Sequence, residues 1–133
     1  MKRVFLDTNI LIDLLGRPEY VNTARKVLIQ GINSDCAFFV SYLSLANYAY
    51  ISRKIGRDIL YENLSLFISV FTVVSNDVKQ LRKALEMEGV DFEDILQFQA
   101  AKVAKCDLII TRNKKDFSFS DIPVLTPDEF LAI

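Results

Sequence analysis

Short apolar runs alternate with longer segments of helical periodicity along the chain. The apolar runs predict strands at residues 4–6, 36–40, 71–74, 108–111 and 123–125. Apolar residues at helical spacing predict helices at 9–15, 20–32, 44–55, 58–68, 78–88 and 93–104, with a last one after Thr126. Strands that are apolar throughout and separated by helices indicate an α/β fold, with a parallel sheet covered on both faces. Ligands bind such sheets beyond the carboxyl ends of the strands.

The composition of the chain indicates which classes of protein it could belong to. The 133 residues are 51% hydrophobic and 25% charged, which suits one domain with one core. A net charge of −1 provides no overall basic field, which disfavours a DNA-coating protein but leaves local binding of RNA open. Asp7 interrupts the short apolar run near the N-terminus, unlike a signal peptide, and no apolar window is long enough to span a bilayer. We therefore expect a cytoplasmic protein without membrane association.

The chain contains no histidine. This excludes Ser-His and Cys-His nucleophilic catalysis and any metal site that needs an imidazole. Cys36 and Cys106 are far apart and lie beside apolar residues, so we expect buried reduced thiols. Any catalysis must then rest on carboxylates, hydroxyls, lysines or a metal with oxygen ligands.

Asp7 follows the first predicted strand and precedes the first predicted helix. Taken alone, it is best interpreted as the helix N-cap, since Asp is a favoured cap that contributes about 1 kcal/mol. Its place beyond the carboxyl end of a strand also suits a ligand-binding residue. Asp13, later in the same helix and close to Arg17, is expected to be solvated.

Asp94 is in phase with Phe98, on the helix face predicted to lie against the sheet. An ionised carboxylate on that face is costly unless it is paired or binds a metal. Asp91 is a natural N-cap, so Asp94, three residues later, is also compatible with a variant of the capping box. Glu93, in phase with Gln97, is expected to be more exposed.

Polar and charged residues also follow the predicted strand at 108–111. They are Thr111, Arg112, Asn113, Lys114, Lys115 and Asp116. A solvated turn is the structural interpretation, because Asn and Asp favour turns. The basic residues would equally provide positive charge for a nucleic-acid backbone.

Asp7, Asp94 and Asp116 are all predicted at one edge of the sheet. Clustered carboxylates raise one another's pKa, and a fold that gathers them usually neutralises them with a divalent cation. Oxygen ligands alone select Mg²⁺ or Mn²⁺. Such a cation lowers the pKa of bound water and holds a phosphate, which is the chemistry of phosphodiester hydrolysis.

Four blocks of the chain, in order, resemble the PIN domain family. They are V-F-L-D-T-N-I-L-I-D from Val4, V-S-Y-L-S-L-A-N-Y-A-Y-I-S-R-K from Val40, D-F-E-D-I-L-Q-F-Q-A-A-K from Asp91 and I-I-T-R-N-K-K-D-F from Ile109. The closing I-P-V-L-T-P-D-E-F-L, from Ile122, resembles the tail of bacterial toxin-type (VapC-like) members. The resemblance implies a single PIN-like domain over residues 1–133. Its fold would be a three-layer α/β/α sandwich with a central parallel sheet of about five strands.

The resemblance also implies a function. It implies an endoribonuclease, dependent on Mg²⁺ or Mn²⁺, that hydrolyses RNA phosphodiesters by a metal-activated water. It further implies the toxin of a toxin–antitoxin pair, with an antitoxin partner and a homodimer. By motif, the catalytic and metal-binding residues are Asp7, Asp94 and Asp116. The supporting residues are Asn9, Asn47, Thr111 and Asn113, and the candidates for RNA binding are Arg112, Lys114 and Lys115.

One residue departs from the family pattern. Asn47 stands in the second block where many members carry Glu. Its amide oxygen could still bind a cation or water, but it adds no negative charge, and affinity for a hard cation depends on ligand charge. Glu62 is one carboxylate that could compensate. The alternative function is a catalytically weak or inactive PIN-like module that acts by binding protein or RNA.

Overall fold

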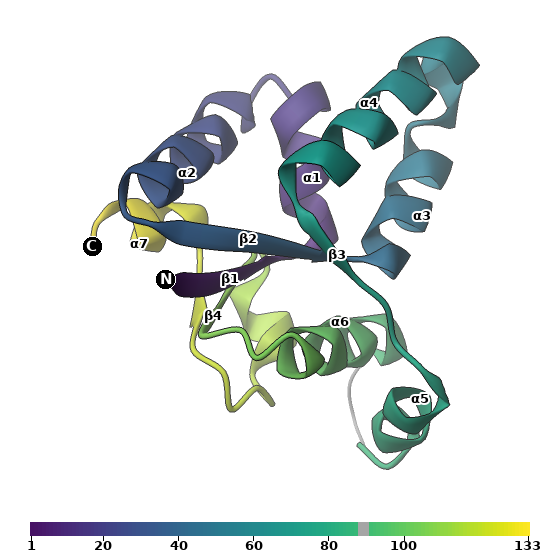
Figure 1. Cartoon of the computed structure of the whole chain (residues 1–133), viewed down its shortest axis with the longest axis vertical. Helices are drawn as coiled ribbons and strands as arrows, with labels where there is room; N and C mark the ends of the chain where they lie inside the picture. Colours follow the sequence, from purple (N-terminus) through teal and green to yellow (C-terminus); the bar gives the residue numbers. More distant parts are fainter. Residues whose placement is uncertain (88–90) are drawn as a thin grey trace.

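A parallel sheet forms the centre of the molecule (Figure 1). The computed structural model describes residues 1–87 and 91–133. Within them, the sheet has five strands in the order β3-β2-β1-β4-β5. Their bounds are β1 Lys2–Leu6, β2 Cys36–Ser41, β3 Thr72–Val74, β4 Leu108–Ile110 and β5 Val124–Leu125. Every strand pair is parallel, so the predicted α/β class and the parallel sheet are confirmed.

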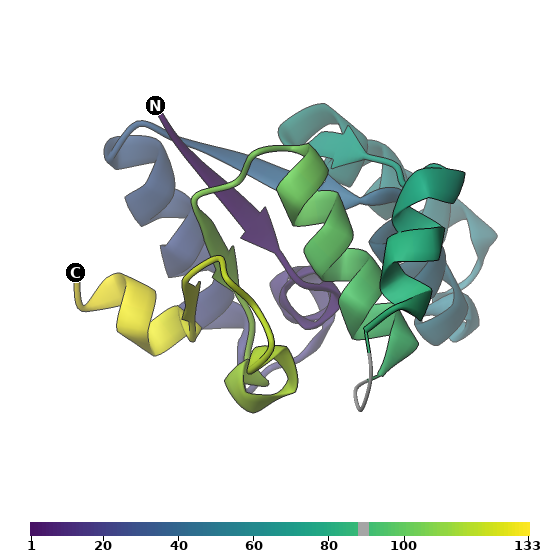
Figure 2. The same cartoon turned by 90° about the horizontal axis from the view of Figure 1, so that it is seen from below.

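The sheet is covered by helices on both faces, which explains why the buried parts of its strands are apolar, although β1 begins with the polar Lys2 and Arg3. Above the sheet in Figure 1 lie α1 Thr8–Gly16, α2 Val21–Asn33, α3 Tyr42–Ile51 and α4 Arg57–Val70, with α7 Pro127–Leu131 beside α2. On the opposite face lie α5 Val78–Leu85 and α6 Phe92–Val103. Figure 2 shows α6 crossing that face with α5 alongside it. The predicted three-layer arrangement is confirmed.

The register of β1 distributes its side chains between two cores. Val4 and Leu6 point into the core shared with α1, α2, α3 and α4. Phe5 points into the opposite core, where it packs with Phe98 of α6 and with Phe117. This alternation is the two-residue period of a strand, applied to a strand that is buried on both sides.

Helix boundaries differ from prediction most clearly at α3. The helix begins at Tyr42 rather than 44, because the Ser41 hydroxyl caps it by accepting a hydrogen bond from the Ser44 backbone N–H at 2.9 Å. It ends at Ile51, and the rest of the predicted 44–55 helix is the 3₁₀-helix η1 Arg53–Ile55. Gly56, with a φ of 96°, then turns the chain into α4. The helix predicted at 78–88 ends earlier, at Leu85, with Glu86 as its C-cap; residue 88 itself lies outside the described residues.

The strand order changes direction beside β1, and we call the switch point between the carboxyl ends of β1 and β4 the crevice. The chain runs from β1 outward through β2 and β3, then returns to the other side of β1 for β4. The loops that leave β1 and β4 therefore diverge at their carboxyl ends, which is where ligands bind in open parallel sheets. Asp7 follows β1 directly, and Thr111 follows β4 directly. No helix in the described parts of the chain is long and apolar enough to cross a membrane.

Candidate functional site

Asp7 occupies the crevice between the ends of β1 and β4. It is the N-cap of α1, and its Oδ1 accepts a hydrogen bond from the Thr8 backbone N–H at 2.8 Å. Its Oδ2 accepts hydrogen bonds from the Thr111 hydroxyl at 2.8 Å and the Asn9 amide at 3.3 Å. The residue is only 7% exposed, and burial raises its pKa although the bonds from Thr111 and Thr8 oppose the rise. The predicted cap is confirmed, and capping leaves the carboxylate facing the crevice.

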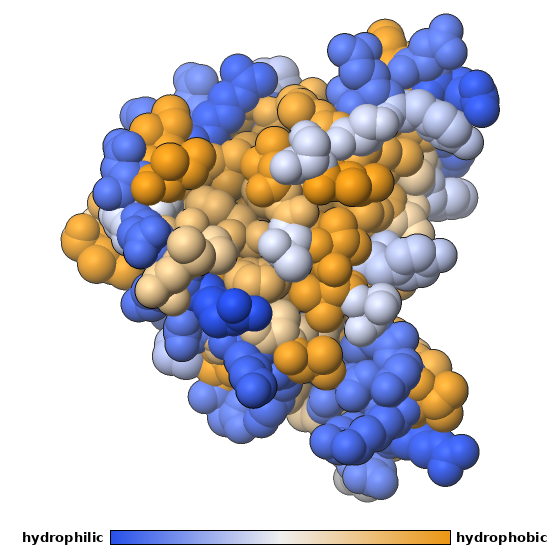
Figure 3. Space-filling model, in the orientation of Figure 1, coloured by the Kyte–Doolittle hydropathy of each residue, from blue (hydrophilic) through white to orange (hydrophobic). Residues whose placement is uncertain are grey.

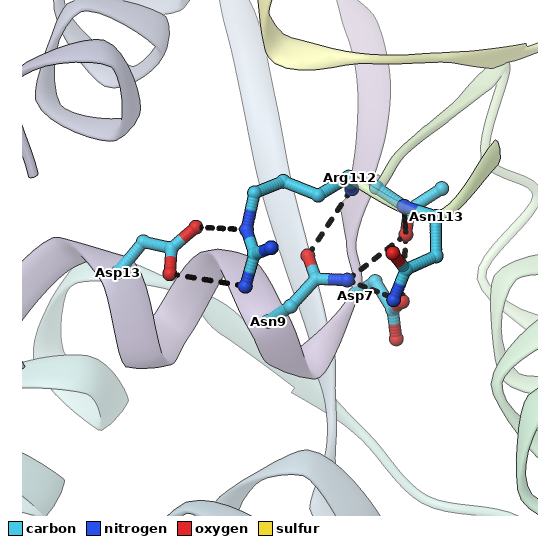
Figure 4. Close-up of polar contacts among 6 residues, drawn as sticks. Asp7, Asn9, Asp13, Arg112 and Asn113 are labelled. Atoms are coloured by element: carbon cyan, nitrogen blue, oxygen red, sulfur yellow. Dashed lines mark hydrogen bonds and ion pairs between the residues drawn. The ribbon is translucent and has the colours of Figure 1, made fainter. Parts of the chain in front are cut away.

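Hydrogen bonds join the start of α1 to the loop after β4 (Figure 4). The Asn9 amide donates to the Thr111 hydroxyl at 3.1 Å, and its carbonyl oxygen accepts from the Arg112 backbone N–H at 3.3 Å. The Thr111 hydroxyl also accepts from the Asn113 backbone N–H at 3.1 Å. Asn9 and Thr111 thus both donate to the same oxygen of Asp7 and together orient it.

Asp13 is buried, contrary to the prediction that it is solvated. It is 1% exposed and forms an ion pair with Arg112, whose Nε lies 2.6 Å from the Asp13 carboxylate. The Arg112 guanidinium also stacks over the Tyr20 ring, 4.2 Å from its centroid. Asp13 follows Asn9 by four residues and so shares its helix face, a signal that the sequence offered. The charge of Arg112 is already matched within the protein.

Asp94 reaches the site from the first turn of α6. The cap of that helix is Asp91, whose side chain accepts hydrogen bonds from the backbone N–H groups of Glu93 and Asp94. Burial raises the pKa of Asp94 to about 7, and the charges of Asp7, Asp91, Asp116 and Glu93 add to the rise. The carboxylates of β1, α6 and the loop after β4 therefore lie near enough to repel one another.

Asp116 lies on the exposed side of the crevice, in the 3₁₀-helix η2 Lys114–Phe117. Its charge contributes to the raised pKa of both Asp7 and Asp94. Lys115 beside it is exposed, and Lys114 forms a half-exposed ion pair with Glu129 at 3.0 Å. Basic side chains thus stand at the rim of the crevice rather than inside it.

A buried polar cluster missed by the sequence analysis lies beneath the acids. The Gln97 amide donates to the hydroxyls of Thr8 at 2.8 Å and Ser44 at 2.6 Å, and its oxygen accepts from Ser41. Glu93 is exposed as expected, but Gln97, in phase with it, is 1% exposed. Burial is tolerated because the amide is hydrogen-bonded on both sides. The cluster ties α1, α3 and α6 together under the site.

Asn47 lies on α3 and is partly buried. Its amide donates a hydrogen bond to Oε1 of Glu93, across from α6, at 2.5 Å. Although much of Glu93 is exposed, the partial burial of its carboxylate raises its pKa, and the charges of Asp91 and Asp7 add to the rise. Glu93 therefore belongs to the electrostatic surroundings of Asp7, which its place in the sequence did not indicate.

The donor set at this edge fits a hard divalent cation. Every candidate ligand is an oxygen, as Mg²⁺ and Mn²⁺ prefer. In residues 1–87 and 91–133, no ion pair involves Asp7, Glu93, Asp94 or Asp116. Across those same residues, no three Cys, Asp or Glu side chains converge closely enough to hold a metal as they stand. The acids surround the crevice with uncompensated charge, without meeting at one point.

Comparison with known proteins points to one family. Residues 3–115 match the PIN domain family. Ribonuclease VapC1 of Aquifex aeolicus (strain VF5) is 29% identical over 136 residues, covering 97% of this chain and 93% of that protein. VapBC-1 from nontypeable Haemophilus influenzae superposes with a TM-score of 0.71 at 16% identity, covering 95% of this chain and 98% of that one. VapBC2 from Rickettsia felis, bound to a DNA fragment from its promoter, gives 0.69 at 18% identity, covering 93% and 98%. At such identities the two structures establish similarity of fold.

Proposed function

This chain belongs to the PIN-domain family, and on that premise we propose that it is a divalent-metal-dependent endoribonuclease, one PIN-like domain acting as the toxin of a toxin–antitoxin pair. The proposal rests on one feature of the structure, the carboxylates of Asp7, Asp94 and Asp116 around the crevice beside β1. Similarity to Ribonuclease VapC1 supports cleavage of RNA as the reaction. The VapBC complexes among the structural relatives support an antitoxin partner. We expect action in the cytoplasm.

Asp7, Asp94 and Asp116 would hold Mg²⁺ or Mn²⁺. A cation bound there would activate water and offset charge on the phosphate oxygens. The protein's own contribution is orientation: Thr111 and Asn9 hold Oδ2 of Asp7 by hydrogen bonds, and the Thr8 backbone holds Oδ1. Both oxygens accept bonds from neutral donors, so the carboxylate keeps its negative charge available for a cation.

The rim of the crevice would bind the RNA backbone. Lys114 and Lys115 are exposed next to Asp116, where a phosphate could approach the acids. Arg112 stands beside them, but its guanidinium is bonded to Asp13 and is 22% exposed. We therefore assign direct phosphate contact to Lys115 and, once its half-exposed pair with Glu129 opens, to Lys114. Arg112, whose pair with Asp13 is buried, would contribute a weaker, longer-range attraction.

An apolar surface around α4 would bind protein partners. Leu66, Ile68 and Val70 of this helix are about half exposed, and Figure 3 shows hydrophobic residues gathered over α4 and β3. One apolar groove lies between α4 and α3, and another between α4 and the helices α1 and α2. Exposed apolar patches of this kind mark interaction sites. We assign the antitoxin and the second copy of the expected homodimer to these grooves.

The test of this function is RNA cleavage by the purified full chain. We expect cleavage with Mg²⁺ or Mn²⁺ and none after chelation by EDTA, with activity restored by excess cation. Cleavage that persists in EDTA would remove the metal-dependent mechanism. Absence of cleavage with both ions, while RNA still binds, would favour the inactive module that the departure at Asn47 suggests.

A further inference from the structure

The departure at Asn47 is matched by a carboxylate on a neighbouring helix. Asn47 of α3 and Glu93 of α6 are 46 residues apart in sequence, yet the Asn47 amide donates to Oε1 of Glu93. The Glu93 side chain therefore reaches across to the part of α3 from which the second acid is missing. Its backbone is held by the Asp91 cap at 2.9 Å, which fixes the first turn of α6.

The Glu93 carboxylate also lies within the electrostatic range of the other acids. Ser44, one turn before Asn47 on α3, shares the Gln97 amide with Thr8, the residue next to Asp7, so this part of α3 lies beside Asp7. The charge of Asp7 accordingly adds to the raised pKa of Glu93. Within the described residues, Glu93 forms no ion pair with a basic side chain. Among the residues that the structure describes, its carboxylate accepts a hydrogen bond only from the neutral Asn47 amide, so it retains capacity to bind a cation.

We propose that Glu93 supplies the carboxylate that Asn47 lacks, so that α6 contributes two acids to the metal site and α3 contributes the amide that orients one of them. This inference rests on the proposed metal-dependent function. An acid at position 47 beside Glu93 would place two like charges in contact, whereas the Asn amide makes a favourable bond to the same oxygen. Asn47 and Glu93 are therefore a compensating pair.

Glu62, the compensating acid considered from the sequence, does not share these features. It lies exposed on α4, and its charge is not among those that raise the pKa of Asp7, Glu93 or Asp94. It is therefore a matched control: an acid of the same type, outside the cluster.

The test is Mn²⁺ binding to the full chain, measured by calorimetry without RNA. We expect Glu93→Gln to weaken Mn²⁺ affinity by about tenfold or more, and Glu62→Gln to leave it unchanged. The double variant Asn47→Glu/Glu93→Gln restores a carboxylate from α3, so its affinity should return to within a few-fold of the native protein. Thermal melts confirm that each variant is folded. In Glu93→Gln, the amide oxygen of the new side chain can still accept the bond from Asn47.

The outcomes separate this inference from the proposed function. Native affinity in Glu93→Gln, together with lost affinity in Asp7→Asn, would overturn the role of Glu93 alone. An equal loss of Mn²⁺ affinity in Glu62→Gln and Glu93→Gln would also overturn it, because the loss would then come from the change in net charge and not from the position of Glu93. The metal site, and with it the proposed function, would be overturned if Asp7→Asn and Glu93→Gln both bound Mn²⁺ as tightly as the native protein. It would also be overturned if neither the native protein nor any variant bound Mn²⁺.

Discussion

The two sides of the crevice satisfy their carboxylates in different ways. On the β1–β4 side, Asp7 accepts three hydrogen bonds, and Asp13 is paired with Arg112. On the α6 side, Asp94 is half buried, has no ion pair within the described residues, and has a pKa raised to about 7. The carboxylates on the β1–β4 side are therefore held by hydrogen bonds or an ion pair within the protein. The carboxylate of Asp94 on the α6 side carries charge that no basic group in the described structure neutralises.

This difference suggests that the two sides have different roles in the proposed metal site. Bonds to Asn9 and Thr111 fix the position of Asp7, so the β1–β4 side would define where a cation sits. Repulsion among Asp94, Glu93 and Asp7 makes the α6 side the part that gains most when a cation binds. Substitutions on the β1–β4 side should therefore disturb the position of Asp7. Substitutions on the α6 side should change how strongly a bound cation stabilises the protein.

The largest effect is expected from Asp7→Asn. The amide keeps a similar shape but removes negative charge at the centre of the proposed site, so the RNA cleavage rate should fall on the order of 1000-fold. Single-turnover cleavage with saturating Mg²⁺ measures it. Asp121→Asn is the control, since Asp121 is an exposed acid paired with Lys102 before β5. If Asp121→Asn lowered the rate as much as Asp7→Asn, Asp7 would have no special role.

Breaking the buried ion pair should cost stability. Arg112→Met leaves Asp13 buried without a partner, which should lower the free energy of unfolding by roughly 3 kcal/mol. Lys102→Met breaks the exposed pair with Asp121 and should cost less than about 1 kcal/mol. Urea denaturation compares the two. The double variant Asp13→Leu/Arg112→Met should recover most of the loss, and failure to do so would mean that Arg112 stabilises through Tyr20 instead.

The pH dependence of the free energy of unfolding should reflect the protonation of Asp94. Its pKa is about 7 in the folded protein and near 3.8 in the unfolded chain, so the folded state holds the proton more tightly. Its contribution to stability is therefore greatest at low pH and is lost as pH rises from about 4 to 7. Because the group is partly exposed, Asp94→Asn should raise the free energy of unfolding at pH 8 by only about 1 kcal/mol.

Urea denaturation in EDTA at pH 5 and pH 8 measures this effect. Asp94→Asn should gain stability at pH 8 and little at pH 5. Asp77→Asn, at the cap of α5, should show no such gain, because the charge of Asp77 is not among those that raise the pKa of Asp94. Added Mn²⁺ should stabilise the native protein more than Asp94→Asn. An equal gain at both pH values would show that charge is not the cause.

The smallest effect is expected at the rim. Lys115→Ala should weaken RNA binding a few-fold at low salt and lower the slope of log affinity against log salt by about 1. Lys79→Ala, on exposed α5, is the matched control. Fluorescence anisotropy with Asp7→Asn protein avoids cleavage during the titration. An unchanged salt slope would show that Lys115 makes no phosphate contact.

Much of the fold follows from local pattern. All five strands of the described structure lie within or overlap the predicted apolar runs, because strand segments buried on both faces are apolar. β1 starts two residues before its predicted run, since Lys2 and Arg3 lie at the less buried end of the sheet. The α3 boundary was wrong because the cap is the last residue of β2, Ser41, which an apolar pattern does not reveal. Asp7 at a strand end and Asp94 on the inner side of α6 were also predictable, since strand ends and helix phase are local properties.

The sequence by itself determined the class of fold, the acids that follow its strands and helix starts, and the resemblance to the PIN family. Only the tertiary structure decided what each acid meets: Thr111 for Asp7, Arg112 for Asp13 and Asn47 for Glu93. These partners are 46 to 104 residues apart, so their meeting depends on strand order and helix packing. For the same reason Gln97 is buried, and Glu93, one turn earlier, reaches Asn47 of α3. Periodicity gives the face of a helix, but packing decides which side chains lie opposite it.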